Sequence, residues 1–151
     1  MTQTKLQQSQ SSKLIFFGVL LFLLGLLIAL FIPMMANSRM GLSAHLEGVM
    51  NGMFLIILGQ IWHKIKLNER WSSSVYWLML YSAFANFTAV TISAITGVGK
   101  MMPIAGGVEG STLLEGLISF LLISLALTII LALSIVLKGL YNHLNNSEQS
   151  V

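Results

Sequence analysis

Apolar positions along the chain gather into four long blocks separated by short polar stretches. These blocks cover residues 14–32, 44–62, 75–95 and 113–137. Each is close to the roughly 20 residues that a helix needs to cross the hydrocarbon core of a bilayer. In lipid the backbone groups must be satisfied within the segment, and the alternating pattern of a membrane β-strand is missing. The sequence therefore predicts an all-α integral membrane protein, a four-transmembrane-helix bundle.

The remaining residues predict one membrane domain between two polar tails. The domain covers residues 14–140, with an N-terminal tail at 1–13 and a C-terminal tail at 141–151. Both tails are rich in Gln, Ser or Asn, so we expect them to be disordered or frayed. The first apolar block is longer than the apolar part of a signal peptide, about 7–15 residues, and is predicted to be a true span.

The placement of positive charge predicts the orientation. With four spans, both termini and the loop between the second and third spans share one side. That side carries Lys5, Lys13, Lys64, Lys66, Arg70 and Lys138, whereas the other carries Arg39 and Lys100. The excess predicts cytoplasmic termini, in a bacterial inner membrane. We expect an aromatic belt at the same interface, made of Trp62, Trp71, Tyr76, Trp77 and Tyr141.

Composition narrows the function classes. Of 151 residues, 56% are hydrophobic and 9% charged, and the mean hydropathy is +0.84. Soluble domains carry about a quarter charged residues. The net charge of +3 reflects few acids rather than a basic patch, so no nucleic-acid partner is implied. With 0 Cys, disulfides and thiolate-bound metal centres are excluded.

Polar residues inside the second block point to a functional site. At about 100° per residue, Gly48 and Gly52 lie near the face of His45, whereas Glu47 and Asn51 share a different face. An ionisable residue in a span costs roughly 2.5–3.5 kcal/mol on insertion scales, so each one needs a reason. The two faces predict two different contacts, for example a neighbouring subunit and the bundle interior.

Structural alternatives exist for each of these residues. His45 lies near a helix entrance and is equally explained as an interfacial histidine. Glu47 can pair with Arg39 or Lys100 at the outer interface. The G-x-x-x-G pair of Gly48 and Gly52 is most often plain helix packing, and asparagines in spans often serve as interhelical hydrogen-bond partners.

The third block adds polar residues that need partners in lipid. Ser82 and Asn86 are four apart on one face, and we expect them to form a polar pocket with Glu47 and Asn51. Glu115, at the entrance of the fourth block, is expected to have a structural role at the helix N-terminus rather than to pair with Arg39.

His45 is a candidate metal ligand, but one chain cannot complete a zinc site around it. Such a site needs three or four protein ligands, and His63 and His143 belong to the opposite side of the membrane. Either a threefold oligomer brings three copies of His45 together, or the cofactor brings its own ligands, as haem does. A glycine-lined histidine face suits a flat macrocycle.

Three segments resemble the hydroxylaminobenzene mutase family. They are NSRMGLSAHLEGVMNGM at residues 37–53, YSAFAN at 81–86 and MMPIAGG at 101–107. More distantly, the chain is similar to styrene oxide isomerases through the His-x5-Asn-Gly-Met pattern of residues 45–53. The isomerases have an acidic residue and a tyrosine where this chain has Ser82 and Val90, so the mutase branch fits better.

The resemblance implies a homotrimer with haem b at the subunit interface and His45 as its iron ligand, beside Gly48 and Gly52. It implies rearrangement of an aromatic hydroxylamine to an ortho-aminophenol, or, by the isomerase pattern, of an epoxide to an aldehyde. Our hypothesis is that haem iron acts as a Lewis acid. Glu47 or Asn51 would orient the NH–OH group or handle the proton, and Asn86 would hold the other side of the pocket. A non-enzymatic membrane assembly protein is the competing class.

Overall fold

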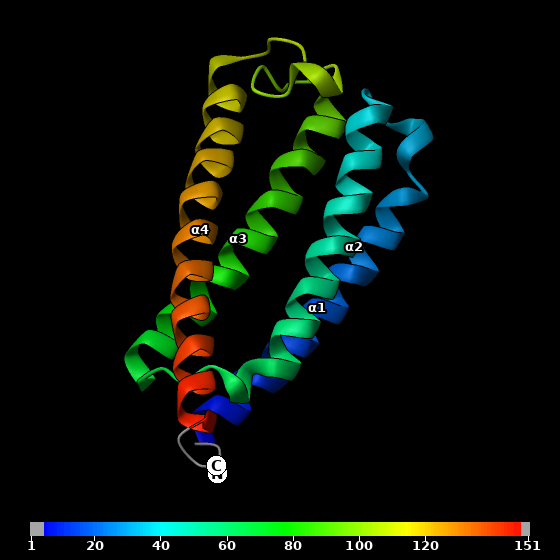
Figure 1. Ribbon diagram of the computed structural model, residues 1–151. Coiled ribbons are helices and arrows are strands. Elements are labelled where there is room, and N and C mark those ends of the chain that lie inside the picture. Colours follow the sequence, from blue (N-terminus) through cyan, green and yellow to red (C-terminus); the bar gives the residue numbers. More distant parts are fainter. Residues whose placement is uncertain (1–4, 149–151) are drawn as a thin grey trace.

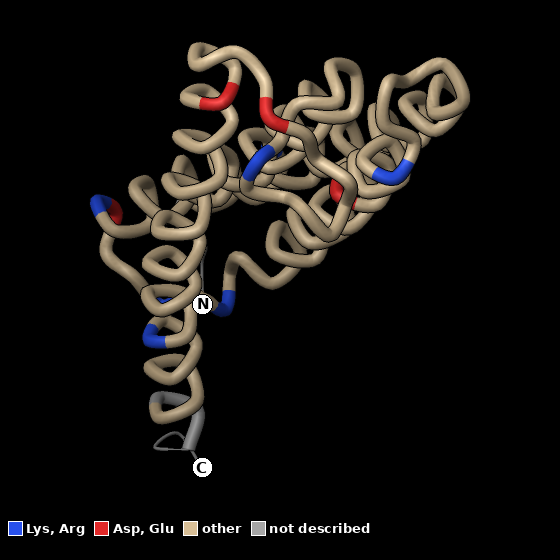
Figure 2. Tube along the Cα trace, turned by 90° about the horizontal axis from the view of Figure 1, so that it is seen from above, with Lys and Arg blue, Asp and Glu red and all other residues tan. Residues whose placement is uncertain are grey.

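The computed structural model describes residues 5–148 and is a bundle of four long helices (Figure 1). They are α1 (Lys5–Ala29), α2 (Ser38–Ile61), α3 (Glu69–Thr96) and α4 (Thr112–Glu148), with single 3-10 turns η1 (Ile32–Met34), η2 (Trp62–Lys64) and η3 (Pro103–Ala105) between them. All four are long and apolar enough to cross a membrane. Charged residues interrupt them at few points (Figure 2). The predicted all-α architecture with four spans is confirmed for the described residues.

The helices pack as two pairs, α1 against α2 and α3 against α4, and α2 joins the pairs through α3. The apolar core lies mainly in the half of the bundle that holds the termini; its fully buried members include Leu14, Leu55, Trp62, Val75 and Met79. Toward the other end α4 diverges from α3, whose last turn stays beside the start of α2, where Asn37 N donates to Ala94 O at 3.0 Å (Figure 1). The first turn of α1 and the last turn of α4 lie at the same end of the bundle, as an even number of spans requires.

The N-terminal tail is helical from Lys5, which corrects the prediction that residues 1–13 are disordered or frayed. Gln10 explains the difference because its amide is buried and forms hydrogen bonds through both its oxygen and its nitrogen. Its Oε1 accepts hydrogen bonds from Ser72 Oγ at 2.7 Å and from Trp62 Nε1 at 3.1 Å, and its Nε2 donates to Ser73 Oγ at 3.2 Å. Residues 1–4 lie outside the described part of the chain.

The expectation that the C-terminal tail is disordered or frayed is wrong for its described residues. Helix α4 continues through Glu148. No Gly or Pro follows Gly139 to end it, so each added residue gains a helical hydrogen bond. Residues 149–151 lie outside the described part.

The predicted aromatic belt is only partly correct. Trp71, Trp77 and Tyr141 are exposed, but Trp62 and Tyr76 are buried in the core. Trp62 turns inward because Gln10 gives its indole N–H a partner there. An amphipathic side chain at the interface can therefore belong to the protein interior when a buried acceptor is present.

The loop between α3 and α4 folds over the divergent end of the bundle. Gly97 ends α3 with a φ of 76°, and Asn37 Nδ2 donates to the carbonyl oxygens of Ala105 at 3.0 Å and Gly106 at 2.9 Å. Glu115 accepts from the backbone N–H groups of Lys100 and Gly110, both at 3.2 Å. The structural role predicted for Glu115 is confirmed, since the carboxylate ties the loop to α4.

Candidate active site

Helix α2 presents its two polar faces to different neighbours. His45 and Glu47 are two residues apart and therefore point about 200° apart around the helix. The imidazole of His45 contacts α1, whereas the carboxylate of Glu47 contacts α3. The two contacts predicted from the sequence are thus separate, and within one protomer His45 and Glu47 do not share a site.

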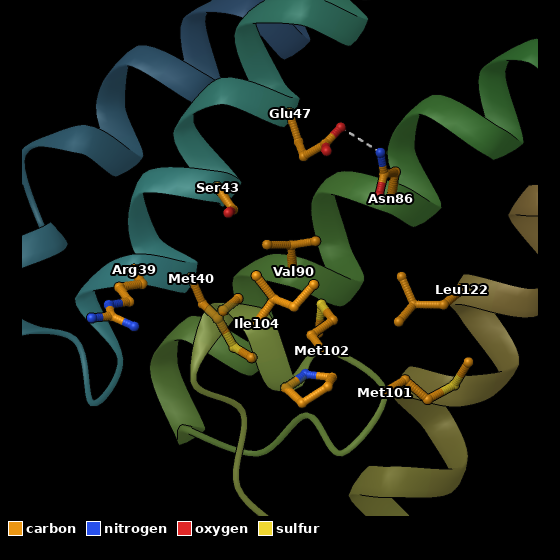
Figure 3. A pocket seen from close by; sticks show the side chains of 12 residues that line it. Arg39, Met40, Ser43, Glu47, Asn86, Val90, Met101, Met102, Ile104 and Leu122 are labelled. Atoms are coloured by element: carbon orange, nitrogen blue, oxygen red, sulfur yellow. Dashed lines mark hydrogen bonds between the residues drawn. The ribbon is translucent and has the colours of Figure 1, made fainter.

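The carboxylate of Glu47 is held by two side-chain amides. Its Oε2 accepts from Asn51 Nδ2 at 3.1 Å, one turn along α2, and from Asn86 Nδ2 on α3 (Figure 3). The predicted meeting of Glu47, Asn51 and Asn86 is confirmed. Neither alternative ion pair is present, because Lys100 pairs with Glu109 at 3.1 Å and Glu47 is oriented by neutral donors instead.

Glu47 and Asn86 border a cavity of about 530 Å³ between α2, α3, α4 and the outer loop (Figure 3). Its remaining walls are mainly apolar and are formed by Met40, Val90, Met101, Met102, Pro103, Ile104, Ala105 and Leu122. Ser43 and Arg39 add two further polar side chains. An apolar chamber with a few convergent polar groups is typical of a small-molecule site.

A smaller cavity of about 100 Å³ continues on the far side of Asn86. Asn51, Asn86 and Ser82 supply its polar surface. Ser82 Oγ donates to the carbonyl of Leu78 at 2.7 Å and lies 2.8 Å from Thr128 Oγ1. Ser82 therefore borders the predicted polar pocket but bonds to α3 and α4 rather than to Glu47.

The outer loop supplies wall residues to which the sequence assigned no role in the site. Met101, Met102 and Ile104 line the larger cavity, and they come from the segment MMPIAGG that resembles the mutase family. The hydrogen bonds from Asn37 fix this loop over the chamber. A contact between residues more than sixty positions apart in the sequence leaves no local signal, so only the folded chain reveals it.

Gly48 and Gly52 pack against α1, which is the structural alternative considered for them. A Cβ on Gly48 would lie 2.5 Å from Gly25 Cα, and one on Gly52 would lie 2.7 Å from Gly18 O. These glycines let the two backbones touch. Since α1 of the same protomer fills the space beside them, they do not offer a free surface to a macrocycle.

His45 nevertheless has the chemistry to be the single protein ligand of a cofactor. Its Nδ1 lies 2.8 Å from the carbonyl oxygen of Gly25, to which it donates, so the lone pair is on Nε2. Histidines that ligate metals usually donate the other ring N–H to such an acceptor. Among residues 5–148 no group of three His, Cys, Asp or Glu side chains gathers to hold a metal ion. A lone imidazole suits a cofactor that brings its remaining ligands.

The fold and the site together describe a membrane protein with a carboxylate held by amides at the wall of an apolar cavity. Comparison with known proteins shows that it is an enzyme. Residues 10–141 match the family described as styrene oxide isomerase. Two relatives from Ectopseudomonas oleovorans are similar: hydroxylaminobenzene mutase HabB, 45% identical over 85% of this chain and 79% of that protein, and hydroxylaminobenzene mutase HabA, 42% identical over 82% and 93%. No solved structure matches with significance.

The chain therefore belongs to the styrene oxide isomerase family and is similar to two hydroxylaminobenzene mutases. It is an integral membrane enzyme of the isomerase class.

Proposed function

We propose that this enzyme rearranges an aromatic hydroxylamine to an ortho-aminophenol. The carboxylate of Glu47, clamped by amides at the wall of an apolar cavity of about 530 Å³, carries the proposal. The mutase names of two relatives over 40% identical support the substrate class. A one-ring arylhydroxylamine is small and apolar enough to enter such a chamber from the bilayer.

The atom balance of the reaction assigns a role to Glu47. The nitrogen–oxygen bond breaks, a carbon–oxygen bond forms at the ortho carbon, and one ortho proton is finally replaced by a proton on nitrogen. A carboxylate beside the substrate can accept the first proton and return the second. Asn51 and Asn86 leave one carboxylate oxygen available, because both donate to Oε2. They position the base and make its geometry independent of bulk water.

Haem b is the proposed cofactor, and His45 is the residue that would hold it. When bound, haem would supply a Lewis-acidic iron to the hydroxyl oxygen. The hydrogen bond to Gly25 and the absence of other clustered ligands in the described chain support a single protein ligand. Gly48 and Gly52 act on this site indirectly, since they set the contact between α1 and α2 that places the Gly25 carbonyl.

The opposite orientations of His45 and Glu47 favour an oligomer, which we propose to be a homotrimer. Because His45 does not line the cavity of its own protomer, a cofactor on His45 would reach a Glu47 carboxylate only across a subunit boundary. A closed ring of three protomers offers three identical boundaries of this kind. We further propose a bacterial inner membrane location with cytoplasmic termini, from the six Lys and Arg residues at that end against two at the other.

The decisive experiment combines a spectrum with an assay. Wild-type protein purified in detergent should show a Soret band and convert phenylhydroxylamine to 2-aminophenol. His45→Ala should lose both, while His63→Ala, an exposed histidine at the opposite end, should keep both. Active protein without haem would refute the cofactor but not the mutase reaction. Metal analysis distinguishes haem iron from zinc bound by three copies of His45.

Epoxide isomerisation is the second candidate, because the family match carries that name. In an epoxide-to-aldehyde rearrangement the migrating hydrogen moves within the substrate, so no proton carrier is needed. The position of Glu47 therefore favours the mutase reaction. Faster conversion of styrene oxide than of phenylhydroxylamine by the same preparation would reverse this assignment.

A further inference from the structure

A second cavity, of about 370 Å³, lies at the opposite end of the bundle from Glu47. It is bounded by the segment between α2 and α3, the first turn of α3 and the C-terminal half of α4. Its described lining residues are Lys66, Leu67, Asn68, Trp71, Ile135, Lys138 and Asn142. The mutase chemistry leaves this cavity without a role.

The walls of this basic cavity are fixed by contacts outside it. Lys66 N donates to the carbonyl of Gly139 at 3.1 Å, so the connecting segment is bonded to α4. A Cβ on Gly139 would lie 2.7 Å from Ile65 Cγ2, which shows how closely the Ile65 side chain packs on the backbone of α4. The side chain of Asn68 accepts a hydrogen bond from Trp71 N at 2.9 Å and thereby caps the N-terminus of α3. The cavity is therefore a preformed part of the fold.

The chemistry of the lining combines cations with an apolar base. Lys66 and Lys138 bring two ammonium groups, and none of the described lining residues is acidic. Leu67 and Ile135 bring apolar surface, and Trp71 is half-exposed, with a ring suited to the headgroup region. A soluble anion would use the lysines but not the apolar walls.

The position of Lys138 along α4 indicates how deep the cavity lies in the membrane. Lys138 directly follows the apolar block of residues 113–137, so its ammonium lies at the edge of the hydrocarbon. Lipid phosphates lie at this level, and basic pockets between helices there suit anionic headgroups. The geometry points to a binding site for an anionic glycerophospholipid, with its phosphate between Lys66 and Lys138 and its glycerol backbone against Leu67 and Ile135.

The test measures lipid binding to detergent-purified full-length protein by native mass spectrometry. Phosphatidylglycerol should bind more tightly than phosphatidylcholine, whose choline opposes the two lysines. Removing one lysine near a headgroup should weaken binding about fivefold, so Lys66→Gln/Lys138→Gln should bind phosphatidylglycerol roughly 25-fold more weakly. The matched control, Lys5→Gln/Lys13→Gln, removes the same charge from exposed positions at the same end and should bind as wild type does.

Three outcomes would overturn the proposal. Equal binding by the pocket variant and wild type would show that the cavity is not the site. Equal loss in both double variants would indicate diffuse attraction to positive charge. Thermal stabilisation by inorganic phosphate as large as that by phosphatidylglycerol would identify the ligand as a soluble anion. A pocket variant that unfolds is recognised from its melting curve, and Lys138→Gln alone then serves, with an expected loss of about fivefold.

Discussion

In the reaction proposed above, the proton transfers depend on one carboxylate, that of Glu47, which two neutral donors hold. A charge within a membrane helix is expensive, and here it faces the bundle interior, where Asn51 and Asn86 offset part of that cost. Neutral amides orient the carboxylate without supplying a countercharge. The group therefore stays available to exchange a proton with a substrate in the cavity.

Replacing Glu47 by Gln should abolish most of the mutase activity while leaving the fold intact. The amide is isosteric and its carbonyl oxygen can keep the hydrogen bonds from Asn51 and Asn86, but the amide can neither accept a proton from the substrate nor return one. General acid–base catalysis by one side chain contributes about 10²–10⁴-fold, so kcat should fall by at least about a hundredfold. Initial rates of 2-aminophenol formation measure this. Glu109→Gln, which alters an exposed carboxylate in the outer loop, should keep wild-type rates.

Asn86→Ala should test whether Asn86 positions Glu47 or merely packs beside it. Removing this donor leaves Asn51 alone to orient the carboxylate. We expect kcat to fall by about tenfold to a hundredfold with a smaller change in KM, because the lost hydrogen bond to a charged group is worth about 1.5–3 kcal/mol. In the Glu47→Gln background the same change should have little further effect. An additive loss would show that Asn86 acts separately from Glu47.

At the residue scale the sequence predicted this cluster, and for a clear reason. The spacing of Glu47 and Asn51 fixes a shared face, and Asn86 needs a partner in lipid. Spacing does not say which neighbour covers a face. For that reason the sequence correctly assigned Gly48 and Gly52 to one face of α2 but predicted a cofactor beside them, whereas the structure has α1 there.

At the scale of elements, the contact between α1 and α2 depends on glycines on both helices. Gly18 and Gly25 of α1 meet Gly52 and Gly48 of α2 so closely that backbone atoms touch. This contact brings the Gly25 carbonyl to the His45 ring. Packing of the two helices thereby determines which ring nitrogen of His45 is left for a ligand.

Gly52→Ala should destabilise the protein, because its Cβ would lie 2.6 Å from Phe22 N and 2.7 Å from Gly18 O, both backbone atoms. The helices can only separate, and we expect a lower melting temperature and weaker haem retention. Gly116→Ala is the matched control, since nothing lies within 4 Å of a Cβ there. It should leave stability unchanged or slightly higher. Equal behaviour of both variants would argue against a tight α1–α2 contact.

Gln10→Leu should loosen the end of the bundle that holds the termini. The change leaves the buried hydroxyl of Ser72 and the indole N–H of Trp62 without their acceptor. An unsatisfied buried donor costs about 1–3 kcal/mol, so the melting temperature should fall clearly. Gln8→Leu, at an exposed position on the same helix, should have little effect. The polar composition around Gln10 concealed this role, since a buried glutamine and a tail glutamine look alike in sequence.

At the scale of the whole molecule, hydropathy sufficed for the number and type of helices but not for where they end. The apolar blocks mark the membrane-crossing parts, and α1 and α4 extend beyond them because tertiary contacts and unbroken helical hydrogen bonding continue. The cavity was beyond prediction because four separate segments form it. The outer loop closes it through Asn37, a contact that no periodicity encodes.

The separation of His45 and Glu47 on opposite faces of α2 leads to a prediction about the assembled enzyme. If each active site combines His45 of one protomer with Glu47 of the next, two inactive variants should complement one another when co-expressed. In randomly mixed rings of His45→Ala and Glu47→Gln protomers, a site is complete when an intact histidine faces an intact glutamate. The protomer that supplies the histidine has an intact His45 with a probability of about one half, and the protomer that supplies the glutamate has an intact Glu47 with the same probability. About a quarter of the boundaries in a closed ring are therefore complete. Mixed preparations should recover about that fraction of wild-type activity, whereas the two variants purified separately and then combined in detergent should recover none unless protomers exchange. Activity at the background of either variant in co-purified mixed rings would show that each protomer works alone, and would remove the reason for a trimer.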